Sequence, residues 1–263
     1  TNIGAGYGGA GIGAPFVGKR GTQIPEYFFN GLADEVAIWD RALTEAEIGQ
    51  NAGGPFRTQG TGEYVSTIIT NDAGPAIWQT LFWMPDAPYS KPLSVSDSTL
   101  MALWRLEESA NPVTNLVASN NGIFNGAGWG ADGRFSRCLD FNGTSDFVTI
   151  PHDAGGRLNP AKLTIEAWVN LDDAVSRAVV DKLNVSGYLL GTDAGGRPYF
   201  RVQGTTCTGY QPVRAGKWTH LAGTYDSPRL KLYVDGEIAG AVDIVGLNTV
   251  AAVPLIVGRN QAA

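Results

Sequence analysis

The segment from residue 28 to residue 43 constrains the fold of this chain more than any other stretch. Residues 32–39 combine aliphatic, β-branched and aromatic side chains, as is typical of a buried strand, and Gly31 lets the chain turn into it. An Asp34–Glu35 pair interrupts the apolar residues. The segment has the character of a strand that closes a domain, yet it stands near the amino terminus.

A short helix is predicted directly after this strand. Thr44 and Glu47 have the spacing of a capping box, in which the threonine caps the helix and the glutamate reaches back to it. Residues 51–55 contain two glycines followed by a proline, which is a helix stop signal.

Composition narrows the class of protein. The chain has 263 residues, of which 35 are glycine, with 43% hydrophobic and only 17% charged residues, and this favours strands and turns over long helices. The net charge of -6 without basic blocks argues against nucleic-acid binding, and no apolar run has the length of a membrane span. Because the chain begins at Thr1 and shows no signal peptide, we expect a processed protein, a fragment, or one unit of something longer.

Three regions are predicted. Residues 1–57 hold a glycine-rich loop, which lacks the Gly-Lys-Ser/Thr end of a phosphate-binding loop, followed by the strand and helix. Residues 58–98 read as a β-hairpin linker with a proline-rich connector, and a lone hairpin needs a surface to lie on. Residues 99–263 read as a series of strands, with alternation at 163–170 and a strong turn signal at Asp235–Gly236.

The strand-and-helix segment resembles the C-terminal signature of laminin-G-like and pentraxin-like domains of the concanavalin A-like superfamily. Residues 100–108, 133–150, 217–226 and 255–258 resemble further strands of that family, in the family's order. The resemblance implies an all-β fold, an antiparallel two-sheet jelly-roll sandwich with one short helix and the extra hairpin. It also implies that the closing strand has been moved to the front, as in a circular permutation or a repeat cut at a loop.

The displaced strand would leave a gap beside the opening strand. The side chains expected to fill it are Leu32, Val36, Ile38 and Trp39, and those expected to receive them are Leu100, Ala102, Leu103 and Trp104. The strand could fold back within its own chain, or it could complete the sandwich of the next copy and build a head-to-tail fibre. The need of the hairpin linker for a surface favours the second arrangement.

The sequence gives little sign of catalysis. His152 and His220 are the only histidines, and no G-x-S-x-G motif accompanies them. Glu166 stands alone on its predicted strand, without the E-x-D-x-E run of related glycosidases. We therefore expect no enzyme.

The sequence leaves two questions open, namely whether the chain binds calcium and whether its two cysteines form a disulfide. By resemblance, calcium could bind where the opening and closing strands meet, at Asp34, Glu107 and Asn142; alternatively Asp34 and Glu35 cap backbone amides and Glu107 is solvated. Cys138 and Cys207 could form a disulfide in an extracellular setting or remain two buried thiols.

The predicted function is that of a structural subunit or repeat of an extracellular or cell-surface filament or adhesin, assembled by strand complementation with copies of itself. The alternative is a monomeric adhesion module that binds a carbohydrate or a protein. For a glycan ligand, aromatic side chains could stack on sugar rings unless they are core residues. The candidates are Trp129, Trp168, Tyr188, Tyr199 and Tyr210.

Overall fold

The structure, a computed structural model, describes residues 28–53, 93–126, 128–183, 186–244 and 252–260. The glycine-rich residues 1–27 and the strands predicted at 64–69 and 77–83 lie outside the described residues.

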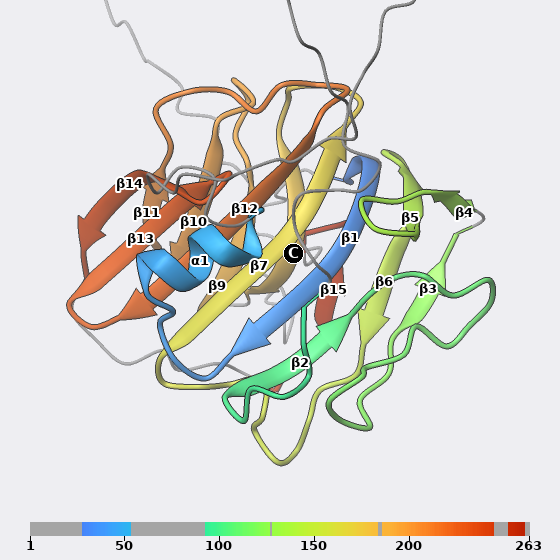
Figure 1. Ribbon diagram of the computed structural model, residues 1–263, viewed down its shortest axis with the longest axis horizontal. Coiled ribbons are helices and arrows are strands. Elements are labelled where there is room, and N and C mark those ends of the chain that lie inside the picture. Colours follow the sequence, from blue (N-terminus) through green and yellow to red (C-terminus); the bar gives the residue numbers. More distant parts are fainter. Residues whose placement is uncertain (1–27, 54–92, 127, 184–185, 245–251, 261–263) are drawn as a thin grey trace, which may run out of the picture.

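The described residues form two antiparallel sheets that pack face to face, with one short helix on the outside (Figure 1). The eight-stranded sheet has the order β14-β13-β12-β7-β1-β5-β4, with β2 also paired to β1. Its strands are β1 (Asn30–Trp39), β2 (Leu100–Trp104), β4 (Gly128–Asp132), β5 (Arg137–Asn142), β7 (Leu163–Leu171), β12 (Trp218–Asp226), β13 (Arg229–Val234) and β14 (Glu237–Asp243).

The seven-stranded sheet has the order β11-β10-β9-β8-β15-β6-β3. Its strands are β3 (Ile123–Asn125), β6 (Phe147–Ile150), β8 (Arg177–Leu183), β9 (Gly187–Thr192), β10 (Pro198–Val202), β11 (Thr205–Thr208) and β15 (Leu255–Val257). The predicted fold class, an antiparallel two-sheet sandwich with one short helix, is confirmed.

The main core lies between the two sheets. Alternation along the strands places every second side chain there, so that Phe200 and Val202 of β10 are buried while Tyr199 and Arg201 point outward and are partly exposed. In β7 the pattern differs, because residues on both faces are buried. The outer face of the eight-stranded sheet is therefore covered around β7.

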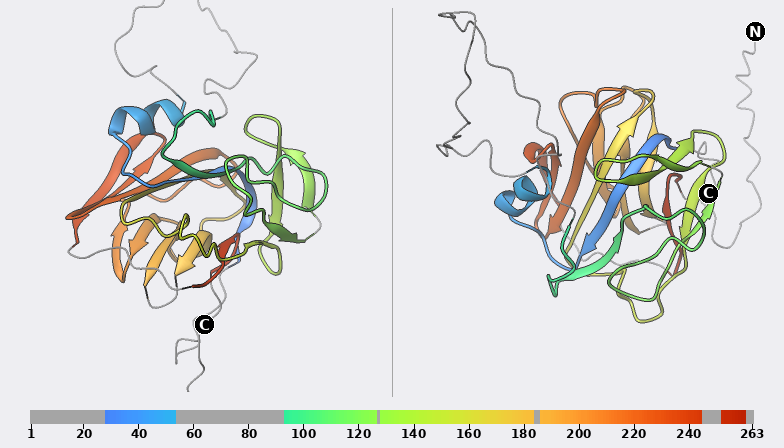
Figure 2. Two further views of the ribbon diagram at one scale, coloured as in Figure 1. Left: turned by 90° about the horizontal axis from the view of Figure 1, so that it is seen from below. Right: turned by 45° about the vertical axis from the view of Figure 1, so that its right-hand side comes forward.

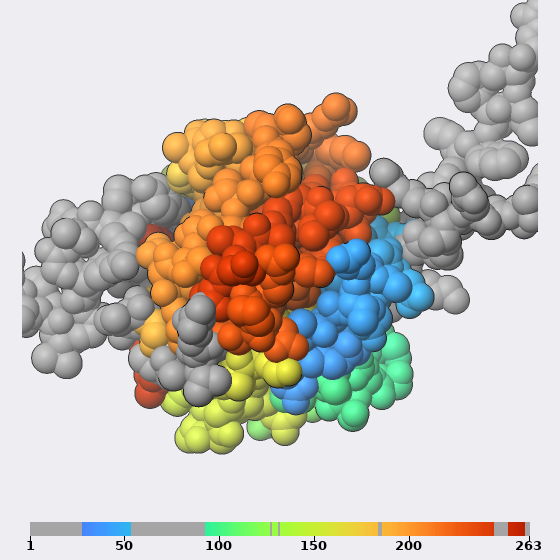
Figure 3. Space-filling model, turned by 90° about the vertical axis from the view of Figure 1, so that its left-hand side faces the viewer, coloured from blue at the N-terminus to red at the C-terminus, as the bar shows by residue number. Residues whose placement is uncertain are grey.

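The helix α1 (Glu45–Asn51) provides part of that cover. It lies on the side of the eight-stranded sheet that faces away from the seven-stranded sheet (Figure 2, left). Its Ile48 packs in a second apolar cluster with Ala37, Trp39 and Tyr233. The space-filling view shows the same segment, in blue, pressed against the orange and red strands β13 and β14 (Figure 3). No helix among the described residues is long and apolar enough to cross a membrane.

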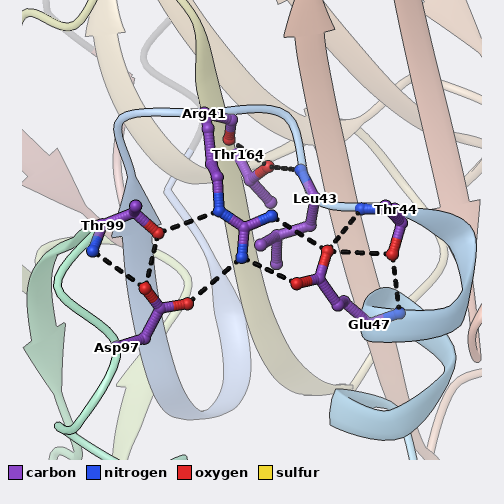
Figure 4. A network of polar contacts seen from close by, with 7 residues as sticks. All are labelled: Arg41, Leu43, Thr44, Glu47, Asp97, Thr99 and Thr164. Carbon is purple, nitrogen blue, oxygen red and sulfur yellow. Dashed lines mark hydrogen bonds and ion pairs between the residues drawn. The ribbon is translucent and has the colours of Figure 1, made fainter.

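The predicted capping box is present at the start of α1. Thr44 Oγ1 accepts a hydrogen bond from the Glu47 backbone N–H, and Glu47 Oε2 accepts one from the Thr44 backbone N–H at 2.8 Å. Glu47 also forms a bidentate ion pair with Arg41, whose guanidinium reaches Asp97 and Thr99 in the segment before β2 (Figure 4). One arginine therefore ties the helix to the entry of β2.

Residues near the two ends of the described chain lie side by side. The Phe29 backbone N–H donates to the Gly258 carbonyl at 2.7 Å, and Phe28 forms an antiparallel bridge with Arg259. Phe28 and Phe147 also contact the Arg259 guanidinium, which lies 3.9 Å from the centroid of the Phe147 ring. The chain that enters β1 therefore lies beside the chain that leaves β15, although β1 comes first among the described strands and β15 comes last.

Candidate functional site

The displaced strand β1 completes the sandwich within its own chain. Its carboxyl-terminal half pairs with β2, with Val36 opposite Trp104 and Ile38 opposite Ala102, and its amino-terminal half pairs with β5. On its other side β1 pairs with β7 along nearly its whole length. The structure therefore has the cis arrangement, and the predicted exchange between copies receives no support from it.

The predicted gap-filling side chains do not share one core. Val36 and Ile38 enter the main core, whereas Trp39 joins the second cluster under α1. Leu32 is only partly buried, because it lies on the outer face opposite Asn170. On β2 the same division places Ala102 and Trp104 in the main core and Leu100 and Leu103 in the second cluster.

The other edge of β2 is also occupied. The Leu103 backbone N–H donates to Asn115 Oδ1 at 3.2 Å, and the Leu103 carbonyl accepts from the Leu116 backbone N–H at 2.9 Å. An exposed strand edge invites pairing with another chain. Here β1 and the Asn115 loop cover both edges of β2, so the predicted acceptor strand offers no open position.

A bulge in β1 places two carboxyl groups on the outer face of the sheet. Ala33 and Val36 both belong to the main core, and the register with β7 shifts between Asp34 and Ala37. The backbone of Glu35 is in the left-handed region, with φ of 49°. Asp34 and Glu35 are 0% and 1% exposed.

Burial has the largest effect on the pKa values of Asp34 and Glu35. It raises the pKa of Asp34 to about 7, although backbone N–H groups of Arg134 and Phe135 donate to Asp34 Oδ2 and lower it. It raises the pKa of Glu35 to about 7 as well, against the lowering effects of the Leu93 backbone N–H and of Arg105. Asp34 Oδ1 and Glu35 Oε1 accept no hydrogen bond from the residues that the structure describes. The alternative that Asp34 and Glu35 accept from backbone amides agrees with these contacts.

The three predicted calcium ligands do not meet. Asn142 lies opposite Asn30, four residues along β1 from Asp34, which is roughly 13 Å in a strand. Its Oδ1 accepts from Thr144 and Ser145 within its own turn. Of the other two predicted ligands, only Glu107 lies close enough to Asp34 to raise its pKa. Within the part of the chain that the structure describes, no three acidic, histidine or cysteine side chains converge as metal ligands.

One further buried pair lies on the outer face of the same sheet. His220 Nε2 of β12 is 3.7 Å from Glu166 Oε2 of β7, and both side chains are 1% exposed. Trp168 packs edge-on against the His220 ring, and the Arg134 guanidinium covers Trp168 at 4.3 Å. This pair is enclosed and inaccessible to a substrate. Sequence reasoning placed both residues on strands but did not predict their contact.

Of the two alternatives for the cysteines, a disulfide or two buried thiols, the structure has the second. Cys138 and Cys207 are both buried free thiols. Cys138 is on β5 in the eight-stranded sheet, beside β1 and β4, whereas Cys207 is on β11, which packs near β13 and β14 at the far end of the sandwich. The strand order therefore separates the thiols across the width of the molecule.

Most of the aromatic residues considered for sugar stacking are structural. Tyr188 is fully buried and donates through its hydroxyl to the Leu158 carbonyl, and Trp168 is 5% exposed. Trp129 packs against the main core and Tyr199 is partly buried. Tyr210, at 79% exposure, is the widely exposed member of the set.

A pocket of about 550 Å³ opens on the surface beside β2. It is formed by one strand and two loops that are distant in sequence. Its lining consists of Met101, Ala118, Ser119, Asn120, Asp153, Gly155 and Arg157. This set mixes apolar side chains with planar polar groups, and its volume is in the range of small-molecule sites.

The pocket loops are fixed by hydrogen bonds of asparagine and aspartate side chains. Asn115 Nδ2 donates to Asn120 Oδ1 at 2.7 Å, while Asn115 Oδ1 accepts from the backbone N–H groups of Leu103 and Val117. On the opposite wall, the two carboxylate oxygens of Asp153 accept from the backbone N–H groups of Gly155 and Arg157, each at 2.9 Å. Asn120 Nδ2 is buried and has no partner among the described residues. The walls are therefore preorganised, with one amide donor left over.

Sequence reasoning missed this pocket. The available signal is an asparagine-rich turn at 115–121 and a turn at 153–157 that begins with an aspartate, but nothing in the sequence indicates that the two turns face each other.

Comparison with known proteins gives distant structural likenesses. Domain 4 of AbnA, a GH43 extracellular arabinanase from Geobacillus stearothermophilus solved with arabinotriose, is 15% identical with a TM-score of 0.47, covering 58% of this chain and 80% of that one. The binding domain of botulinum neurotoxin serotype C1 is 14% identical with a TM-score of 0.46, covering 62% of this chain and 43% of that one. These likenesses bear on neither ligand nor activity.

A search of curated proteins gives no match to this chain. A family model does match. Residues 142–263 fit the laminin G model described as the concanavalin A-like lectin/glucanases superfamily, which confirms the predicted laminin-G-like resemblance over that part of the chain.

Proposed function

We propose that this protein is a glycan-binding module that acts outside the cell. The observation that carries the proposal is the preorganised pocket beside β2. The superfamily that residues 142–263 match is named for lectins and glucanases, and this supports a carbohydrate as the ligand.

The chemistry of the lining suits a sugar. Sugar rings present pairs of hydroxyl groups at their edges and C–H groups on their faces. The hydroxyl of Ser119 and the guanidinium of Arg157 can form hydrogen bonds with hydroxyl groups, and Met101 and Ala118 offer apolar contact. At about 550 Å³ the pocket has room for a short oligosaccharide rather than a long chain.

The same lining favours binding over hydrolysis. Glycoside hydrolysis uses two carboxyl groups that flank the bond to be broken. The lining contains one carboxylate, Asp153, and both of its oxygens already accept hydrogen bonds from its own loop. The proposed role is therefore that of a module that holds a glycan without cleaving it.

The test is a glycan array probed with the whole chain and with its Ser119→Trp variant. Each protein is measured with and without calcium, because calcium binding stays a prediction for this chain. Ser119 is exposed, so a tryptophan there fills the pocket without entering the core. Thr206→Trp, an equally exposed position on β11, is the matched control.

We expect saturable binding to a defined set of glycans that Ser119→Trp reduces at least tenfold and that Thr206→Trp leaves unchanged. Absence of binding by the folded protein, or equal binding by Ser119→Trp, would overturn the proposal.

A further inference from the structure

The two charged side chains that line the pocket differ in the contacts that they already make. Its lining holds one cation, Arg157, and one anion, Asp153. The Arg157 side chain is exposed, and its guanidinium has no ion-pair partner in the described part of the chain. An arginine left unpaired in a pocket of an acidic chain is a candidate for ligand recognition.

The Asp153 carboxylate serves the loop rather than the pocket. Its Oδ1 accepts from the Gly155 N–H and its Oδ2 accepts from the Arg157 N–H, so it closes a turn around the residues between them. Each oxygen therefore already accepts one hydrogen bond from the loop itself. Asp153 is therefore a positioning residue, because it fixes the backbone from which the arginine extends.

A buried cation adds to the local positive charge. Lys182 of β8 is fully buried, and its Nζ donates to the Val253 carbonyl at 2.5 Å. Burial lowers its pKa to about 8, while the nearby charge of Asp153 acts in the opposite direction. Lys182 therefore lies close enough to Asp153 for the two charges to interact.

We propose that the pocket selects glycans that carry an anionic group, and that the Arg157 guanidinium binds this group. This inference rests on the proposed function and names the class of ligand for the same site. A guanidinium offers two parallel N–H donors that match a carboxylate, and such paired bonds are stronger than those to a neutral hydroxyl. The neighbouring side chains, Met101 and Asn120, would then contact the ring that bears the charge.

The experiment measures affinity of the whole chain for three oligosaccharides of equal length, one neutral, one with a carboxylate and one with a sulfate. Wild type is compared with Arg157→Gln and Arg157→Lys. Arg214→Gln, which removes an exposed arginine from the loop between β11 and β12, is the control. Circular dichroism and thermal unfolding confirm that each variant is folded.

We expect wild type to bind an anionic oligosaccharide at least tenfold more tightly than the neutral one, with an affinity that falls as salt rises. Arg157→Gln should abolish the preference, and Arg214→Gln should keep it. Arg157→Lys should lose much of the affinity for either anion, because an ammonium group is a point charge without the paired N–H donors of a guanidinium.

Equal affinity for the neutral and both anionic sugars, or a preference that survives Arg157→Gln, would overturn this inference and leave the proposed function standing. Binding of no glycan at all would overturn both.

Discussion

At the scale of single residues, the bulge at Asp34 and Glu35 is the most unusual feature of the chain. A non-glycine residue with a left-handed backbone costs on the order of 1 kcal/mol, and here it also turns two carboxyl groups into an enclosed environment. Their pKa values of about 7 mean that the folded state keeps protons that the unfolded chain has already released at that pH.

The stability of the protein should therefore fall as pH rises. The ordinary values are 3.8 for Asp34 and 4.5 for Glu35, so the loss begins above about pH 4 and is complete once the pH passes about 7. The change is on the order of 4 kcal/mol for Asp34 and on the order of 3 kcal/mol for Glu35.

Asp34→Asn tests this account. The asparagine carbonyl keeps the bonds from Arg134 and Phe135 but cannot ionise. In chemical denaturation at pH 5 and pH 8, the variant should lose less stability than wild type between the two values. Asp172→Asn, at an exposed acid, should follow wild type. Equal pH dependence of Asp34→Asn and wild type would contradict the assignment.

The sequence reveals the acidic pair but not its burial. Alternation alone would place Asp34 and Glu35 on opposite faces of a strand. The bulge that brings them to one face depends on β7 and on the segments around Leu93 and Arg134, which are far away in sequence. The pairing of distant strands also separates the predicted calcium ligands, because Asn142 is opposite Asn30 rather than Asp34.

At the scale of elements, α1 is held on the sheet by a few polar contacts in addition to Ile48. Thr164 Oγ1 accepts from the Leu43 backbone N–H at 2.8 Å and donates to the Arg41 carbonyl at 2.7 Å (Figure 4). These two bonds fix the turn that carries the chain from β1 into the helix.

Thr164→Val should lower the free energy of unfolding by about 1–3 kcal/mol, because it leaves the buried Leu43 N–H and Arg41 carbonyl without partners while keeping the shape of the side chain. Urea denaturation measures this value. Thr206→Val, on an exposed face of β11, should change stability by less than about 0.5 kcal/mol. Equal effects of the two substitutions would mean that the Thr164 bonds do not stabilise the turn.

Elements with strong local signals were predicted correctly. The capping box located α1, and the turn at Asp235–Gly236 located the hairpin of β13 and β14. The strands β3, β4, β8 and β11 were not predicted. Three of them, β3, β4 and β11, have only three to five residues, and β4 contains two glycines. Such strands are defined by pairing with a longer neighbour, which local sequence does not encode.

At the scale of the whole molecule, a strand near the start of the described chain completes the sandwich. β1 lies between β7 on one side and β5 and β2 on the other, and the residues just before it contact the residues just after β15. The resemblance supplied this order of strands. It could not decide between cis and trans pairing, because both arrangements use the same contacts. The pocket was equally beyond prediction, because it joins β2 to two loops that only the tertiary fold brings together.

The central claim is that β1 closes the sheet of its own chain, and a paired-cysteine experiment tests it most directly. Ala37 and Leu103 are opposite each other across β1 and β2. Directly opposed residues of antiparallel strands have Cα atoms about 4.5–5.5 Å apart, which suits a disulfide. After mild oxidation of the Ala37→Cys, Leu103→Cys double variant, with each single variant as control, the products are separated by size without reductant. The account predicts a cross-linked monomer at every protein concentration, whereas a ladder of covalent oligomers specific to the double variant would contradict it.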